Sequence, residues 1–97
     1  MDQQPEGFLR PEAVVLGDEA VVPDKNLIVP PPNQFTHEVT RAAPFFYTRT
    51  HPDAPPVGHF ARGTQVVLLV YEGGSHCRVA DGRGLYVEIE YDSLKRL

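Results

Sequence analysis

The stretch that decides the fold is TQVVLLVYEGGSHCRVADGRGLYVEIE, residues 64–90. It begins with an apolar run, residues 64–71, whose β-branched content and length of eight favour a strand over a helix. Residues 72–75 are turn-forming and separate this run from a second β-prone segment, residues 76–80. The Asp-Gly signal of a tight turn follows, and residues 85–90 then alternate apolar and polar in part. We therefore predict a run of short antiparallel strands.

Further strands are predicted on both sides of this stretch. Residues 45–48 are aromatic and β-prone, residues 50–56 form a polar loop with three prolines, and residues 57–60 form a short strand. Residues 91–97 have room for a helical turn before a last short strand. A small open sheet would leave exposed edges, and closing the sheet on itself removes them. We therefore predict an all-β fold, a small five-stranded barrel over residues 45–97.

The first part of the chain has a different composition. Residues 1–43 carry three basic and seven acidic side chains, whereas residues 44–97 carry six of each, so the formal net charge of −4 comes from the first part. Three consecutive prolines, Pro30 to Pro32, lock φ and remove backbone donors, which favours polyproline II and excludes the interior of a sheet. We place the domain boundary after residue 44 and predict an acidic, proline-rich arm over residues 1–44.

The arm also contains short apolar segments. Residues 13–16 and 20–22 are β-prone, and residues 17–19 between them suit a hairpin loop. Residues 27–29 form a third apolar patch, and residues 38–41 suit another short strand that leads into the compact part. An isolated two-stranded hairpin is marginal in water. We therefore expect the arm to pack on the C-terminal domain, on another copy of the chain or on a partner.

Composition excludes several classes of function. The N-terminus has no basic segment followed by an apolar one, and we expect neither export nor a membrane span. The one cysteine cannot form an intramolecular disulfide, so we expect a reducing, cytoplasmic location. The acidic balance repels nucleic acid and anionic membranes. The sequence contains no catalytic or cofactor motif, and we predict that the protein is not an enzyme and binds no cofactor.

Three sets of residues invite other interpretations. Cys77 and His76 are adjacent on a predicted strand, so their side chains point to opposite faces of the sheet. A catalytic pair would therefore need another histidine near Cys77. A lone buried cysteine more often serves as a small apolar side chain. The four histidines lack the spacing of a metal site, so we predict none. A basic and aromatic surface for nucleic acid could include Arg49, Arg62, Arg78, Arg83 and the tyrosines 47, 71 and 86, but residues 44–97 carry no net charge.

Short motifs follow one another along the second part of the chain: Phe46-Tyr47-Thr48-Arg49, the stretch from Val57 to Thr64, Gly73-Gly74, the stretch from His76 to Val79, the stretch from Asp81 to Val87, and Leu94 to Leu97. Their order and spacing resemble a bacterial SH3-type domain. The resemblance covers residues 45–97 and implies an SH3-like barrel. His76 stands where the family has a tryptophan that opens a strand, and the sequence has no tryptophan.

The resemblance implies a non-enzymatic module that binds another protein or a peptide. The expected binding residues on the barrel are Tyr47, Asp53, Tyr71, Glu72 and Tyr86. In the arm, Pro30, Pro31, Pro32 and Phe35 suit a docking peptide, and a stiff spacer is the alternative. Self-association through the arm is possible. A second hypothesis is a small regulatory, inhibitor or immunity-type subunit whose acidic arm binds a basic enzyme or nucleic-acid-binding partner.

Overall fold

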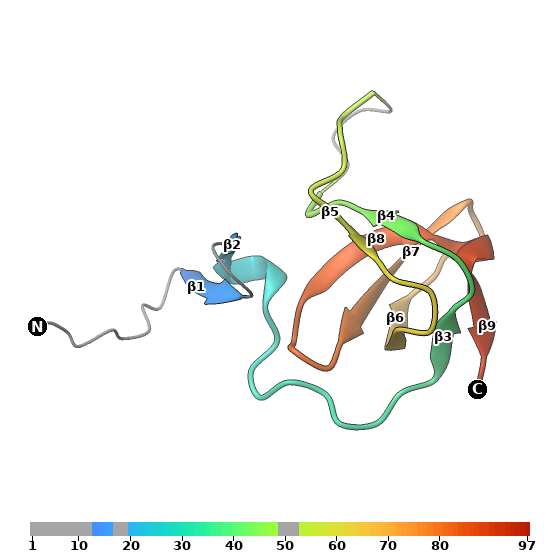
Figure 1. Ribbon diagram of the computed structural model, residues 1–97, viewed down its shortest axis with the longest axis horizontal. Coiled ribbons are helices and arrows are strands. Elements are labelled where there is room, and N and C mark those ends of the chain that lie inside the picture. The colour runs from blue at the N-terminus through green and yellow to red at the C-terminus, as the bar shows by residue number, and fades with distance from the viewer. Residues whose placement is uncertain (1–12, 17–19, 49–52) are drawn as a thin grey trace, which may run out of the picture.

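The computed structural model describes residues 13–16, 20–48 and 53–97 and is mostly β, with no α-helix in these ranges (Figure 1). The elements in chain order are β1 (Ala13–Leu16), β2 (Ala20–Pro23), η1 (Asp24–Asn26), β3 (His37–Val39), β4 (Ala43–Phe45), β5 (Gly58–Phe60), β6 (Gln65–Val70), β7 (His76–Asp81), β8 (Tyr86–Glu90), η2 (Tyr91–Ser93) and β9 (Leu94–Arg96). The two η elements are single 3₁₀ turns. The predicted all-β class is confirmed.

The main sheet has five antiparallel strands in the order β8-β7-β6-β3-β9. Strands β6, β7 and β8 are consecutive neighbours, as the apolar runs and the Asp-Gly turn predict. On β8 the side chains of Val87 and Ile89 are buried, whereas Glu88 and Glu90 are partly exposed. This alternation shows that one face of the sheet packs on the core.

Strand β3 lies between β6 and β9, so the sheet draws one strand from the segment assigned above to the arm. His37 pairs with Val66 of β6 on one side and with Arg96 of β9 on the other. The predicted helical turn and last strand are present as η2 and β9. The turn carries the chain from the end of β8 across to β3, where Leu94 pairs with Val39.

Strands β4 and β5 form a separate hairpin, and the residue after β4 joins it to the main sheet. Phe46 N donates to Glu88 O at 3.0 Å, and Glu88 N donates to Phe46 O at 2.9 Å. Within the hairpin the Phe45 ring lies against Gly58, where a Cβ would come within 2.6 Å of the ring. The glycine is therefore required by the close approach of this aromatic ring.

The core is one apolar cluster that includes three residues of the predicted arm, Val22, Val39 and Ala43. Its buried members are Val22, Val39, Ala43, Phe45, Phe60, Val66, Cys77, Val79, Leu85, Val87 and Ile89. Val22, on β2, is 1% exposed.

The predicted β1–β2 hairpin is present, with Val14 opposite Val22. After η1 the chain runs past the turn between β7 and β8 before it enters β3 (Figure 1). In the described ranges no helix has the length and apolar character to cross a membrane.

Candidate protein-interaction surface

Three consecutive apolar side chains are exposed at the end of β6. Leu69, Val70 and Tyr71 are 46%, 40% and 40% exposed. The preceding Leu68 packs against the core, and the register of β6 on β7 shifts between Leu68 and Val70. A bulge of this kind re-aims the side chains that follow it. We call Leu69, Val70 and Tyr71 together the β6-end surface.

A stacked pair of tyrosines fixes one side of this surface. The rings of Tyr71 and Tyr91 are 3.7 Å apart between centroids and 5° from parallel. Tyr91 begins η2, and its backbone N–H donates to Ser75 O at 2.9 Å. The loop after β6 is thereby tied to the 3₁₀ turn, and the Tyr71 ring is held in place although it is 40% exposed.

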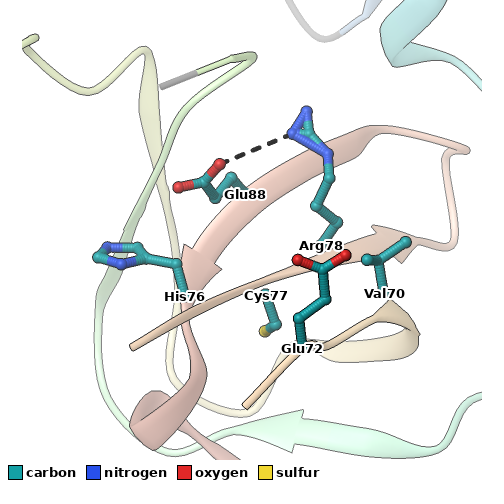
Figure 2. A pocket seen from close by; sticks show the side chains of 6 residues that line it. All are labelled: Val70, Glu72, His76, Cys77, Arg78 and Glu88. Carbon is teal, nitrogen blue, oxygen red and sulfur yellow. Dashed lines mark ion pairs between the residues drawn. The ribbon is translucent and has the colours of Figure 1, made fainter. Parts of the chain in front are cut away.

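Next to the β6-end surface is a pocket of about 300 Å³, lined by Val70, Glu72, His76, Cys77, Arg78 and Glu88. Figure 2 shows these side chains around the opening, with Glu88 directed towards Arg78. The lining comes from the end of β6 and the turn after it, from β7 and from β8. The pocket therefore continues the exposed apolar surface with a mixed lining of apolar, acidic and basic side chains.

The positive charge of Arg78 is engaged within the fold. Both terminal nitrogens of its guanidinium donate to Tyr47 O, one of them at 3.2 Å. The guanidinium also lies 3.9 Å from the Glu88 carboxylate and 4.8 Å from the centre of the Tyr86 ring. These contacts hold β7, β8 and the hairpin strand β4 together.

The other described arginines that were considered above for a nucleic-acid surface lie outside β7. Arg83 forms an ion pair with Asp81 at 2.8 Å, and Arg62 lies exposed in the turn after β5. Arg49 lies outside the described residues.

Cys77 is buried, and its chemistry is that of a protonated thiol at neutral pH. It is 3% exposed, and burial, with a further contribution from the charge of Glu88, raises its pKa to about 11. The neighbouring His76 has its Nδ1 2.8 Å from Ser75 Oγ. A thiol must ionise to act as a nucleophile. This environment therefore suits the apolar interpretation of Cys77.

Residues 22–28 of the arm occupy a second site, which we call the arm seat, on the β7–β8 turn and the start of β8. The Asn26 amide donates to Tyr47 O at 3.0 Å and to Tyr86 O at 2.7 Å. Leu27 forms a bridge with Leu85, and Ile28 N donates to Gly84 O at 2.8 Å. Asn26 is 1% exposed, and its Oδ1 has no partner among the described residues. Sequence reasoning did not single out Asn26, since an asparagine after Pro-Asp-Lys indicates only a turn.

The expected binding residues are distributed over three places. Tyr71 and Glu72 lie on the β6-end surface and in the adjacent pocket. Tyr47 and Tyr86 are partly buried beside the arm seat. The others lie elsewhere: Asp53, Pro30 and Pro31 are exposed, Pro32 is partly buried, and Phe35 is partly buried with its ring beside Gly82.

The described part of the chain contains no group of three or more His, Cys, Asp or Glu side chains that could hold a metal ion. Comparisons with protein-family models, with curated proteins and with solved structures found no match.

Proposed function

We propose that this chain is a non-enzymatic protein-interaction module and that partners dock on the β6-end surface and its pocket. The observation that carries the proposal is the run of three exposed apolar side chains, Leu69 to Tyr71, beside a pocket of about 300 Å³. Single exposed apolar side chains are common, whereas several that are consecutive in the chain and adjoin a pocket with a polar lining indicate an interaction site.

The order of the elements supports an SH3-like barrel as the scaffold. A hairpin with a long connection, β4 to β5, precedes three consecutive strands, and a 3₁₀ turn leads into a last strand beside β3. This order agrees with the resemblance noted in the sequence. The bridge between Phe46 and Glu88 brings the hairpin onto the outer edge of β8, which is the contact that a closed barrel would use.

The chemistry of the pocket favours binding over catalysis. The Arg78 guanidinium is held by Tyr47 O and Glu88, and the Cys77 thiol is protonated at neutral pH. What the surface offers a partner is therefore exposed apolar area, one tyrosine ring and the carboxylate of Glu72. Such a set of groups suits the apolar centre and polar rim of an interface.

Site-specific photo-crosslinking tests the proposal. We would replace Leu69 by the photoreactive residue p-benzoylphenylalanine in the full chain, irradiate it in a lysate of the source organism and identify the adducts by mass spectrometry. Val57 is the matched control, because it is 50% exposed and lies before β5, outside the β6-end surface. We expect a defined adduct at position 69 that is absent at position 57. Equal labelling at both positions, or none, contradicts the proposal.

A salt series with the same probe separates this function from the alternative in which an acidic arm binds a basic partner. Exposed charges are strongly screened as ionic strength rises, whereas an apolar contact is not. The adduct at position 69 should persist between about 0.05 and 0.5 M salt, over which the Debye length falls severalfold. Loss of the adduct across this range supports the acidic-arm hypothesis instead.

A further inference from the structure

The outer edge of β8 is covered by pieces of two different segments. At its far end Phe46 pairs with Glu88, and at its near end Leu27 of the arm pairs with Leu85. Between them the side-chain amide of Asn26 donates to Tyr86 O and Tyr47 O. The arm therefore donates hydrogen bonds to Gly84 O and Tyr86 O, on either side of Leu85, as a neighbouring strand would do.

Residues 22–28 pack tightly in the arm seat. A Cβ at Gly84 would lie 2.4 Å from Ile28 O, so only glycine leaves room for the arm backbone, and Val22 is 1% exposed within the core cluster. The side-chain amide of Asn26 donates hydrogen bonds to two carbonyls that come from different parts of the chain. A second copy of the chain carries these same residues.

The segment that links the arm seat to the sheet lies on the surface, with Pro32 and Phe35 partly buried. Residues 29–35 make no hydrogen bond to any other described residue, and Val29 is 83% exposed. At the next residue the chain is anchored again, since Thr36 N donates to Val66 O at 3.0 Å and Leu97 N donates to Thr36 O at 3.0 Å. The chain thus has two anchored segments and an unbonded tether of seven residues between them.

We propose that residues 22–28 of one copy can occupy the arm seat of a second copy, so that the protein forms dimers by exchanging arms. Every contact of the arm seat is the same within one chain or between two, and the tether has no hydrogen bond to another described residue that would be lost when its path changes. Seven extended residues span roughly 23–25 Å, enough to reach a neighbouring molecule. Exchange of an identical element between protomers is a low-cost route to a dimer.

A complementation experiment with the full chain tests the proposal. Asn26→Ala weakens the arm, and Gly84→Ala blocks the seat. Neither variant alone should shift the monomer–dimer equilibrium much, because the same weakened arm–seat pair is present in the closed monomer and in the exchanged dimer. Mixing the two should enrich heterodimers about tenfold over homodimers, the factor that corresponds to about 1.4 kcal/mol. Only the heterodimer contains a pair in which the arm, from the Gly84→Ala copy, and the seat, from the Asn26→Ala copy, are both intact. Native mass spectrometry of one ¹⁵N-labelled and one unlabelled variant distinguishes heterodimers from homodimers.

Matched controls are Asn33→Ala, an exposed tether residue, and Gly73→Ala, which has a similar positive φ in open space. Both should dimerise like wild type. Monomers at every concentration up to about 1 mM, a range over which even a Kd of 1 mM gives detectable dimer, overturn the proposal. Mixtures with no excess of heterodimer overturn it as well.

A second measurement does not depend on weakening the fold. Leu27 and Leu85 are Cα partners in the bridge, so cysteines at these positions lie within the usual range for a disulfide. We would mix a Leu27→Cys copy with a Leu85→Cys copy under mild oxidation. A disulfide-linked heterodimer in the mixture supports arm exchange. Its absence, while a single chain that carries both cysteines forms the internal disulfide, overturns it.

Discussion

Asn26 in the arm and Arg78 in β7 donate hydrogen bonds to the same main-chain oxygen, that of Tyr47. Tyr47 follows the hairpin strand β4, so this single acceptor joins three parts of the chain that are far apart in sequence. The Asn26 amide also reaches Tyr86 O on β8. Residues 22–28 are consequently part of the folded unit and cover the edge of its sheet.

Asn26→Ala should lower the free energy of unfolding by about 1–3 kcal/mol, because two buried carbonyls lose a donor. Asn26→Asp should cost more, since a carboxylate cannot donate to either oxygen and would be buried as a charge. Urea unfolding followed by circular dichroism measures both, with the exposed Asn33→Ala as control. If Asn26→Ala lowers the free energy of unfolding no more than Asn33→Ala does, the hydrogen bonds of the Asn26 side-chain amide contribute nothing to stability.

Gly84→Ala should destabilise the protein more than Gly73→Ala. Both glycines have φ near +90°, so both substitutions carry the backbone cost of about 1–2 kcal/mol for an alanine in this region. Only at Gly84 would the new Cβ also meet Ile28 O, at 2.4 Å, whereas nothing lies within 4 Å at Gly73. The additional crowding should cost about 1–3 kcal/mol. Equal thermal midpoints for the two variants would contradict the close fit of the arm.

The Cys77 thiol should make stability fall at high pH. Its folded pKa of about 11 lies above its ordinary value of 9.0, so the unfolded chain loses this proton first as pH rises. The stabilisation is fully present below about pH 9 and is lost towards pH 11, with a loss of about 1 kcal/mol by pH 10. We would compare urea unfolding of wild type and Cys77→Ala at pH 7.5 and pH 10. If the two proteins lose the same stability, the thiol is not the cause.

His37 should make the stability of the protein fall as the pH is lowered. Burial, and then the charge of Arg96, lowers the pKa of His37 below its ordinary 6.5. The unfolded chain therefore binds a proton before the folded chain does, so this contribution is present above pH 6.5 and is lost as pH falls through the folded pKa. His37→Gln should lose less stability than wild type between pH 7.5 and pH 5, as measured by urea unfolding. A parallel loss in both proteins would assign the acid sensitivity to other groups.

The strands that could be predicted from the sequence are those with a recognisable pattern of apolar and turn-forming residues. The run in β6 and the alternation in β8 predicted neighbouring strands, and the Asp-Gly turn joined β7 to β8. Strand β3, His37 to Val39, overlaps the short strand predicted over residues 38–41, but three positions show no period that would assign its neighbours. Its place between β6 and β9 depends on pairing with residues more than 25 positions away, which local patterns do not encode.

The same limit applies to the two sites. Tyr71 was singled out as an aromatic residue of the predicted barrel, and Glu72 as a residue of the loop that follows it. Leu69 and Val70 were not, since an unbroken apolar run indicates a buried strand, and only the bulge after Leu68 exposes them. Asn26 acquires its role from partners 21 and 60 residues away, so nothing near it in the sequence marks it.

The most direct test of the arm as part of the folded unit is hydrogen exchange at the backbone amide of Ile28, which donates to Gly84 O. The amide of Glu88, which donates to Phe46 O, provides a reference within the sheet. We predict that the Ile28 amide is protected in wild type and exchanges much faster in Asn26→Ala, while Glu88 stays protected in both. Exchange of Ile28 at the rate of a free peptide in wild type would contradict the docking of the arm.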